Sequence, residues 1–514
     1  MATTYEIHPA IGIARVGTSA VSFVGPEPGL PPAAAYRDAK GNLLRQAARF
    51  RVFRCTRATD GTLRTATEVT AADAKVEWTV HLVNGKGAAE EFPPVASRRS
   101  ASAGVPRLRN ARHTDRAALV IDPGPRTVSA PGEGATFDSG TFLGTKVPLG
   151  DISCDASGAL LVAGGFGKSG FVSPDGSRVP IRNFANNDDW FDDASDGTVT
   201  ARVAVGTRRP VDAKPARVIV APPDFAPGIV NLVTLYDVAV QAAVERGWRS
   251  VPAKPSFARD VQPILLRVLG YQWVLQLARN GHAEGTGMGD FASQWLALGD
   301  PAPAHAGARQ GVLATLRDPH DAVTDDDFGF MPRLHHSDYA AFPNAVLRLT
   351  PTQYAVLQHW ADGHFVKDLD RPKAVRELAP DALDRVALQA CSGGPFFPGI
   401  EVGRIMADPQ TYTEPFRVDP ALPAGRLTAG NAVPWQADFL ACSVDEQAQL
   451  AWWPAQRPYQ VFPSTTAEIS RFWDRGVTGF AGMVDQWHRL GVVVEGRRDD
   501  GTQVFAESER TLPG

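Results

Sequence analysis

The spacing of hydrophobic residues changes near residue 230, and this change constrains the fold more than any other feature of the chain. Before residue 230, short apolar runs end in Gly or Pro. In the same part, the segment KVEWTVHLV has apolar residues at alternate positions, namely Val76, Trp78, Val80 and Leu82. Such alternation is typical of a half-buried strand. Beyond residue 230, apolar residues recur every three or four positions, as in amphipathic helices.

Helix signals in the second part support this division. In LTPTQYAVLQHWADG, Thr350 can cap a helix, Pro351 suits its first turn and Gly363 can end it. The longest pattern, SFARDVQPILLRVLGYQWVLQLARNG, predicts several helical turns that end at its Asn-Gly pair. A chain of 514 residues is too long for one simple core. We therefore predict an α+β fold, with a β-rich domain of sandwich-like sheets over 1–229 and a mainly helical domain over 230–514.

Composition excludes several classes of protein. The net charge is −4, with no concentrated basic face, which argues against a nucleic-acid partner. No apolar run approaches the roughly 20 residues of a membrane-spanning helix, so we expect no membrane partner. The N-terminus lacks a basic stretch followed by an apolar core, the mark of a signal peptide. We expect a cytoplasmic protein, and export without a signal peptide stays open.

The cysteines form no metal-binding or disulfide pattern. Four cysteines are scattered along the chain without a CxxC pair. Neither a structural zinc site nor a disulfide framework is indicated. Tryptophan is abundant by comparison, with eleven residues.

Two further segments could carry chemistry. The acidic loop NNDDWFDDASDG does not match the ligand spacing of a calcium-binding EF-hand, and turn formation by Asp and Asn explains it equally well. His335 and His336 are adjacent, so on a regular element they point in different directions and rarely share a metal. They lie either in a surface loop or in a cleft that binds substrate. We predict no metal ion.

The segments PWQADFLAC and WWPAQRP stand close together near the C-terminus. Asp438 precedes Cys442 by four residues, so the two side chains share a face in a helix and also in a strand. A carboxylate beside a thiol disfavours the thiolate, so the pair does not make a nucleophilic cysteine. It suits a general base next to a group built from the cysteine. Trp452 and Trp453 complete the chemistry, because a thiol and an oxidised indole can be joined covalently.

With these segments the sequence resembles the cysteine tryptophylquinone-dependent amino-acid oxidases, that is, the lysine-ε-oxidase and glycine-oxidase quinoproteins. The resemblance extends over the whole chain. It is carried, in order, by IHPAIGIARVGTS, FANNDDWFDDASDG, PSFARDVQPIL, LTPTQYAVLQHWADG, CSGGPFFPGIE, PWQADFLAC and WWPAQRP.

The resemblance implies a protein-derived cofactor, cysteine tryptophylquinone. In the family the cofactor cysteine follows a required aspartate by four residues, which Cys442 and Asp438 satisfy. The residue four positions before Cys391 is Ala387, so Cys391 is left as a buried thiol. We expect the cross-link to join Cys442 to Trp453, with Trp452 as the alternative.

The implied activity is oxidative deamination of a primary amine or amino acid by O2, with release of ammonia and H2O2. Asp438 would act as the general base, with a pKa raised by desolvation next to the indole. His335 and His336 would line the substrate pocket. We also expect a flavoprotein maturation partner, because indole oxygenation is demanding and the chain has no nucleotide fingerprint, and a homo-oligomer. Two alternatives are a family member with divergent quinone-dependent chemistry in a biosynthetic pathway and a cofactor-less binding or scaffold protein.

Overall fold

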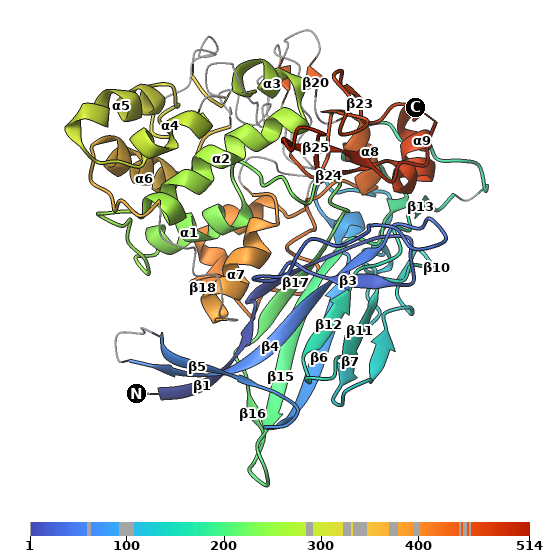
Figure 1. The fold of residues 1–514 in the computed structure, drawn as a ribbon. Coiled ribbons are helices and arrows are strands. Elements are labelled where there is room, and N and C mark those ends of the chain that lie inside the picture. The colour runs from blue at the N-terminus through green and yellow to red at the C-terminus, as the bar shows by residue number, and fades with distance from the viewer. Residues whose placement is uncertain are drawn as a thin grey trace.

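The computed structural model describes most of the chain, with gaps. The described residues are 2–58, 63–91, 107–173, 175–283, 291–321, 330–332, 347–369, 379–393, 401–441, 444–445, 450–451 and 454–513. Strands dominate the first part and helices gather in the second (Figure 1). The predicted α+β class, with a β-rich N-terminal half and a mainly helical C-terminal half, is confirmed.

Thirteen strands of the first part form one sheet. Its end strands contact each other, and Arg126 Nε donates to the Thr136 carbonyl oxygen at 2.8 Å, so the sheet curls round on itself. Its main path is β7 (Arg126–Val128), β6 (Lys75–Val83), β15 (Ser195–Ala204), β17 (Ala216–Ala221), β2 (Ile11–Arg15), β4 (Arg45–Arg57), β12 (Leu160–Ala163), β11 (Asp151–Cys154) and β8 (Gly134–Thr136). The strands β1 (Ala2–His8), β3 (Ser22–Val24) and β5 (Leu63–Val69) pair with β4, and β16 (Val211–Asp212) pairs with β15.

Burial along the strands follows the pattern of the sequence. The four alternating apolar residues of β6 are all buried, as predicted. At the centre of the sheet, β17 pairs in parallel with β2, and both strands are buried at every residue. In parallel strands that are covered on both faces, the sequence is a continuous run of apolar residues rather than an alternation of apolar and polar ones. The second part of the chain supplies the cover on one face.

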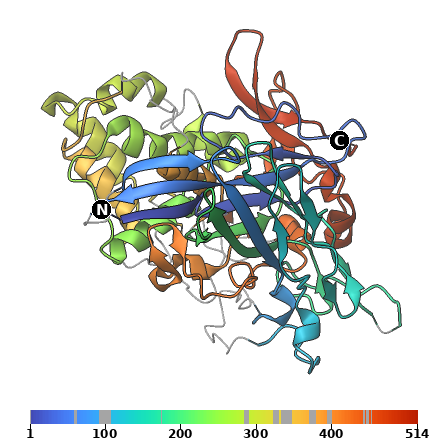
Figure 2. The same cartoon turned by 90° about the horizontal axis from the view of Figure 1, so that it is seen from below.

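The helices lie on one side of the sheet (Figures 1 and 2). A second, smaller core lies among them, and Trp360 at its centre donates from Nε1 to the Leu298 carbonyl oxygen at 2.8 Å. The helices are α1 (Leu235–Glu245), α2 (Gln262–Gly270), α3 (Gln276–His282), α4 (Phe291–Leu298), α5 (Ala306–Ala314), α6 (Pro351–Ala361), α7 (Pro380–Gln389), α8 (Trp435–Ala441) and α9 (Gly479–Gln486).

Short elements complete the described chain. The 3-10 turns are η1 (Lys86–Ala88), η2 (Ala117–Leu119), η4 (Tyr271–Trp273), η6 (Pro303–His305), η7 (Arg404–Ala407), η8 (Pro409–Thr411) and η9 (Trp487–Arg489), and η3 (Phe257–Val261) is a π-helical turn. Two-stranded pairs are β9 (Thr141–Phe142) with β10 (Thr145–Lys146), β13 (Gly170–Phe171) with β14 (Trp190–Phe191), β18 (Tyr412–Glu414) with β19 (Arg417–Val418), β20 (Val444–Asp445) with β21 (Leu450–Ala451), β22 (Gln460–Val461) with β23 (Arg471–Phe472), and β24 (Val492–Arg497) with β25 (Gln503–Ser508).

The helix predicted from its cap and its end residue is confirmed, whereas the long helical pattern is not continuous. Thr350 caps α6 in a capping box with Gln353, and Gly363 closes it with a φ of +81°. The long pattern over 256–281 is instead divided into η3, α2, η4 and α3, and α3 continues past the Asn-Gly pair to His282. The interruption falls at Val274, whose carbonyl oxygen accepts from the backbone N–H groups of Tyr459 and Gln460. This tertiary contact outweighs the local helix periodicity.

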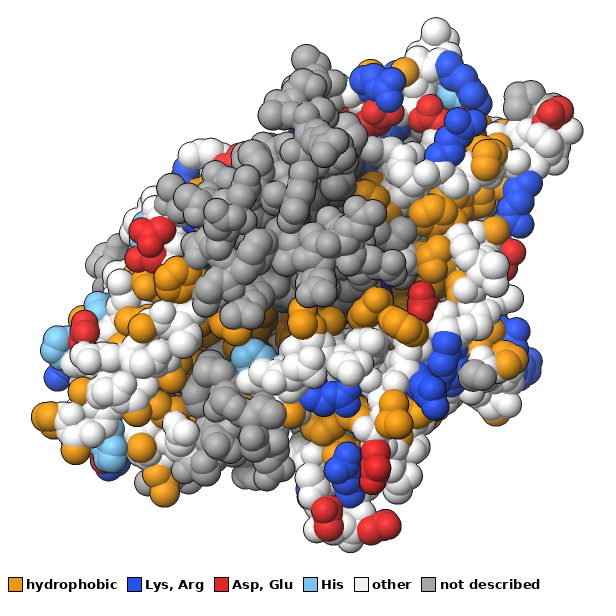
Figure 3. All heavy atoms as spheres, turned by 90° about the horizontal axis from the view of Figure 1, so that it is seen from above, with side chains coloured by type: hydrophobic (Ala, Val, Ile, Leu, Met, Phe, Trp, Pro, Cys, Tyr) orange, Lys and Arg blue, Asp and Glu red, His pale blue; other side chains and the backbone are white. Residues whose placement is uncertain are grey.

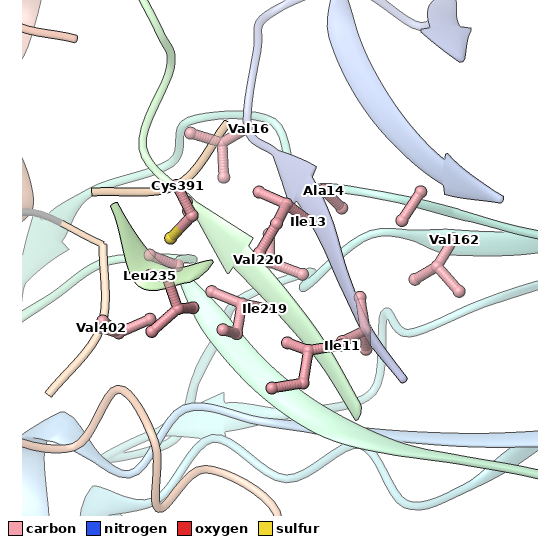
Figure 4. Close-up of a cluster of buried hydrophobic side chains, with 14 of the residues drawn as sticks. Ile11, Ile13, Ala14, Val16, Val162, Ile219, Val220, Leu235, Cys391 and Val402 are labelled. Carbon is pink, nitrogen blue, oxygen red and sulfur yellow. The ribbon is translucent and has the colours of Figure 1, made fainter. Parts of the chain in front are cut away.

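The two parts of the chain meet in one hydrophobic core. Figure 4 shows Ile13 of β2 and Val220 of β17 beside Leu235 of α1, Cys391 and Val402. The sheet is therefore packed directly against segments that lead to the C-terminal part. Within the described ranges, no helix is both long enough and apolar enough to cross a membrane.

Candidate functional site

Asp438 lies in the first turn of α8 and is completely buried. Its Oδ2 accepts from Arg457 Nη1 at 3.1 Å, and the Arg457 side chain is also completely buried. Removing two charges from water is costly unless they face each other. The ion pair therefore fixes α8 against the segment that contains Arg457.

The chain between these two residues doubles back on itself. Val444 of β20 and Ala451 of β21 are antiparallel Cα partners. The predicted cofactor residues all lie between Asp438 and Arg457 in the chain, with Cys442 before β20 and both Trp452 and Trp453 after β21. These three residues, like His335 and His336, lie outside the described residues.

Buried aromatic rings surround α8. Trp435 meets Phe439 and Trp487 edge to face, with centroids 5.0 and 4.9 Å apart. Trp473 packs against Phe225 at 4.9 Å. Gly167, with a φ of +69°, lies where a Cβ atom would come within 2.1 Å of the Trp487 ring. Only glycine allows this close approach, so the helix lies in a tightly packed apolar setting.

The acidic loop fixes the start of α8. Asp192 Oδ2 accepts from the Trp435 backbone N–H at 3.0 Å, and Asp192 Oδ1 accepts from Lys86 Nζ at 2.9 Å. Both charged side chains are buried. Burial lowers the pKa of Lys86, and the Asp192 carboxylate opposes this shift. A negative charge at a helix N-terminus also interacts favourably with the helix dipole. The run of aspartates in the sequence is the signal of this loop, but the pattern alone indicates a turn or a metal site and does not reveal the contact with α8.

Two other aspartates of the loop are also buried. Asp196 accepts from the backbone N–H groups of Gly425 and Thr428 at 3.0 and 2.8 Å. Asp193 accepts from the Lys168 backbone N–H at 2.9 Å. Burial raises the pKa of Asp193 to about 7 and that of Asp196 to about 6. Among the described residues, no group of three or more His, Cys, Asp or Glu side chains is arranged to hold a metal ion.

The segment that follows the tryptophan pair is held from its other side. Asn231 Oδ1 accepts from the Ala455 backbone N–H at 2.9 Å and from the Tyr271 hydroxyl at 3.1 Å. Asn231 Nδ2 donates to Gln456 Oε1 at 2.8 Å. The role of Asn231 is not evident from the sequence, because Ala455 and Gln456 lie more than 200 residues away from it along the chain.

Cys391 is buried as predicted, in the core between the sheet and α1 (Figure 4). Its pKa is raised by burial and by the nearby Glu401 carboxylate, so the thiol stays protonated. Glu401 itself forms a buried ion pair with Arg15 of β2. This cluster ties the CSGGPFFPGIE segment to the sheet.

Two cavities lie near the site. The larger, of about 910 Å³, is formed by α2, α3 and the β24–β25 hairpin. The smaller, of about 280 Å³, is apolar and lies between α2, α3 and α6. Asp438 is not in the described wall of either cavity, but Tyr271, which binds Asn231, lines the smaller one.

Comparisons with known proteins are consistent along the whole chain. Residues 8–220 match the family model L-Lysine epsilon oxidase N-terminal, and residues 331–422 match L-lysine epsilon oxidase C-terminal domain. L-lysine 6-oxidase from Marinomonas mediterranea is 26% identical over 678 aligned positions, which cover 98% of this chain and 89% of that protein.

Solved structures agree on the fold. A crystal structure of the L-Lys ε-oxidase from Marinomonas mediterranea superposes with a TM-score of 0.77 at 23% identity. A second structure of the ε-lysine oxidase from that organism gives 0.79 at 22% identity. Each comparison covers 99% of this chain and 95% of the other. With both family models in order along it, the chain belongs to the L-lysine ε-oxidase family.

Proposed function

We propose that the chain oxidises the amine group of an amino acid or primary amine with O2, through a cysteine tryptophylquinone made from its own residues. Family membership and the relative, an L-lysine 6-oxidase, support an oxidase that acts on the amine group of an amino acid with oxygen as acceptor. The products are ammonia, H2O2 and the corresponding carbonyl compound.

The buried Asp438–Arg457 pair is the observation that carries the cofactor assignment. It joins the chain before Cys442 to the chain after Trp453, so both proposed cofactor residues belong to one closed segment. Cys442 is two positions before Val444, and Trp453 is two positions after its partner Ala451. In an antiparallel pair, residues at the same distance from a paired couple of residues face each other. Cys442 and Trp453 are both two positions from the Val444–Ala451 couple, whereas Trp452 is one position from it, so we favour Trp453. The buried aromatic surroundings of α8 fit an indole-derived group.

The quinone would supply an electrophilic carbonyl carbon for the substrate amine and would accept the electron pair that is removed from the substrate. Asp438 is the general base that accepts the proton from the carbon bearing the amine. A positioned base contributes about 10²–10⁴-fold to the rate. Arg457 holds the carboxylate in one orientation and stabilises its charged form. His335 and His336 are proposed to line the substrate pocket.

Maturation and assembly belong to the same proposal. The described chain has no nucleotide fingerprint that could support indole oxygenation, so a separate flavoprotein inserts the oxygen atoms. The mature protein is a homo-oligomer. Protein produced without the flavoprotein is expected to be a colourless precursor.

A peptide map of the native protein tests the cofactor assignment. A cross-linked peptide that contains Cys442 and Trp453, with a mass that includes two added oxygen atoms, is the expected result. Cys442→Ala should remove the visible absorbance and leave a folded protein. Cys391→Ala is the matched control and should keep the absorbance. The reverse outcome, in which only Cys391→Ala loses the absorbance, would contradict the assignment.

A further inference from the structure

The 910 Å³ cavity lies beside the segment proposed to carry the cofactor. Its wall includes α2, α3, Gly228–Val230 and the β24–β25 hairpin. Val274, next to the lining residue Trp273, accepts backbone hydrogen bonds from Tyr459 and Gln460. Phe462, two residues further along, lines the cavity itself. The same elements thus form the cavity and hold the chain that follows Trp453.

The wall of this cavity is cationic. Arg267, Arg279 and Arg498 line it, whereas no Asp or Glu is found among its described lining residues. Arg267 is neutralised by Asp237 at 2.6 Å. Arg279 donates to Ser470 Oγ at 2.9 Å and Arg498 to the Thr465 carbonyl oxygen at 3.4 Å. Neither of these two makes an ion pair with any part of the chain that the structure describes.

The rest of the wall includes aliphatic side chains and three aromatic ones, Trp273, Phe462 and Phe505. Trp273 meets Phe462 edge to face, with ring centroids 5.7 Å apart, and its ring is tilted against that of Phe505 at 6.3 Å. The guanidinium of Arg279 lies 4.3 Å above the Phe462 ring, which orients it. Guanidinium groups bind carboxylates through two parallel hydrogen bonds. Viewed from above, the described surface shows exposed hydrophobic side chains with Lys and Arg side chains beside them (Figure 3).

We propose that this cavity binds the carboxylate end of the substrate, through Arg279 and Arg498, with an apolar or aromatic body against Trp273 and Phe505. The substrate class is then a carboxylate-bearing amine, such as an amino acid with an apolar side chain or a short peptide. The volume is near the upper end of the roughly 300–1000 Å³ range of small-molecule pockets, which leaves room for a molecule larger than a free amino acid.

This inference rests on the proposed function, and it adds a consequence for specificity. A cationic wall disfavours amines that lack a carboxylate, because their only charge is positive. The enzyme should therefore prefer an amino acid such as phenylalanine to phenethylamine, the same molecule without its carboxylate.

Binding of 3-phenylpropionate to the full-length protein tests the cavity without turnover. This probe has the carboxylate and the aromatic body but no amine. Calorimetry should detect binding that weakens with added salt, and Arg279→Gln with Arg498→Gln should weaken it roughly tenfold or more. Arg279→Lys, which keeps the charge, should retain part of the affinity. Arg497→Gln is the matched control, since Arg497 is exposed on β24 and does not line the cavity.

Turnover provides the second readout. In matured protein the double variant should raise the KM for phenylalanine, leave kcat nearly unchanged, and remove the preference over phenethylamine. No binding of 3-phenylpropionate, or equal binding by the double variant and the wild type, would overturn the inference. So would binding that is lost in the variant without any change in KM. A protein that binds the probe but never forms a quinone would instead contradict the proposed function.

Discussion

Asp438 and Arg457 face each other in a fully buried setting, so neither can be changed without consequence for the other. Asp438→Asn keeps the shape but leaves the Arg457 charge buried without its carboxylate, which should cost about 3–5 kcal/mol of stability. If Asp438 is the base, any matured fraction should also turn over about 10²–10⁴-fold more slowly. Quinone per folded chain and kcat are the quantities to measure.

A second substitution separates the two effects of Asp438. Asp438→Asn combined with Arg457→Gln removes both charges of the pair together, so thermal stability should recover in part. Quinone content and turnover should stay low, because the base is still absent. Normal quinone content and near-normal turnover in the stable double variant would show that Asp438 has a structural role alone.

At the residue scale, the sequence predicts features whose partners are close along the chain, and it does not predict those whose partners are distant. The spacing of Asp438 and Cys442, the Thr350 cap and the buried Cys391 are local or compositional features, and sequence patterns report those. Arg457 and Asn231 were not predicted. Their roles depend on partners brought together only by the fold.

At the scale of elements, α8 is held at its first residue by Asp192. Asp192→Asn removes the charge that pairs with Lys86 and leaves an uncompensated buried cation. We expect a loss of about 3–5 kcal/mol of stability and less quinone per folded chain, because α8 carries Asp438.

Asp189→Asn is the matched control for this prediction. Asp189 belongs to the same loop and is buried, but it bonds Arg112 and His113 rather than α8. It should leave quinone content per folded chain unchanged. If Asp192→Asn matures as completely as the control, α8 does not depend on the loop for its position.

Strand β6 and helix α6 were predictable because their periodicity and caps are encoded within each segment. The sequence pattern predicts helix without a break over this segment. The break at Val274 is caused by Tyr459 and Gln460, which are nearly 190 residues away, so the local pattern does not reveal it. The aspartates of the acidic loop were visible as composition. Their function as partners of buried backbone N–H groups required the second part of the chain to be in place.

At the scale of the whole molecule, carboxyl groups that are buried or largely buried line the contact between the sheet and the rest of the chain. Asp196 bonds Gly425 and Thr428, and Asp224 lies beside the Arg15–Glu401 pair. Burial raises the pKa of Asp224 to about 6, as it does for Asp196. His8, also at this contact, bonds Asp384 of α7 at 3.1 Å. The joint between the two parts is therefore sensitive to protonation.

Asp193 gives this sensitivity a testable form, because its pKa is about 7 in the folded protein and near 3.9 in an unfolded chain. A raised pKa means that the folded state binds the proton more tightly. The resulting stability is fully present below about pH 4 and is lost as the pH rises through 7. Asp193→Asn resembles the protonated form at every pH, so its melting temperature should fall less between pH 5 and pH 8 than that of the wild type, by about 2–4 °C.

Burial lowers the pKa values of His282 and His488, which act in the opposite direction, but they contribute equally to both proteins. Asp212→Asn, at an exposed position on β16, should follow the wild type. Melting curves of wild type and Asp193→Asn that shift in parallel with pH would show that Asp193 is ionised throughout this range.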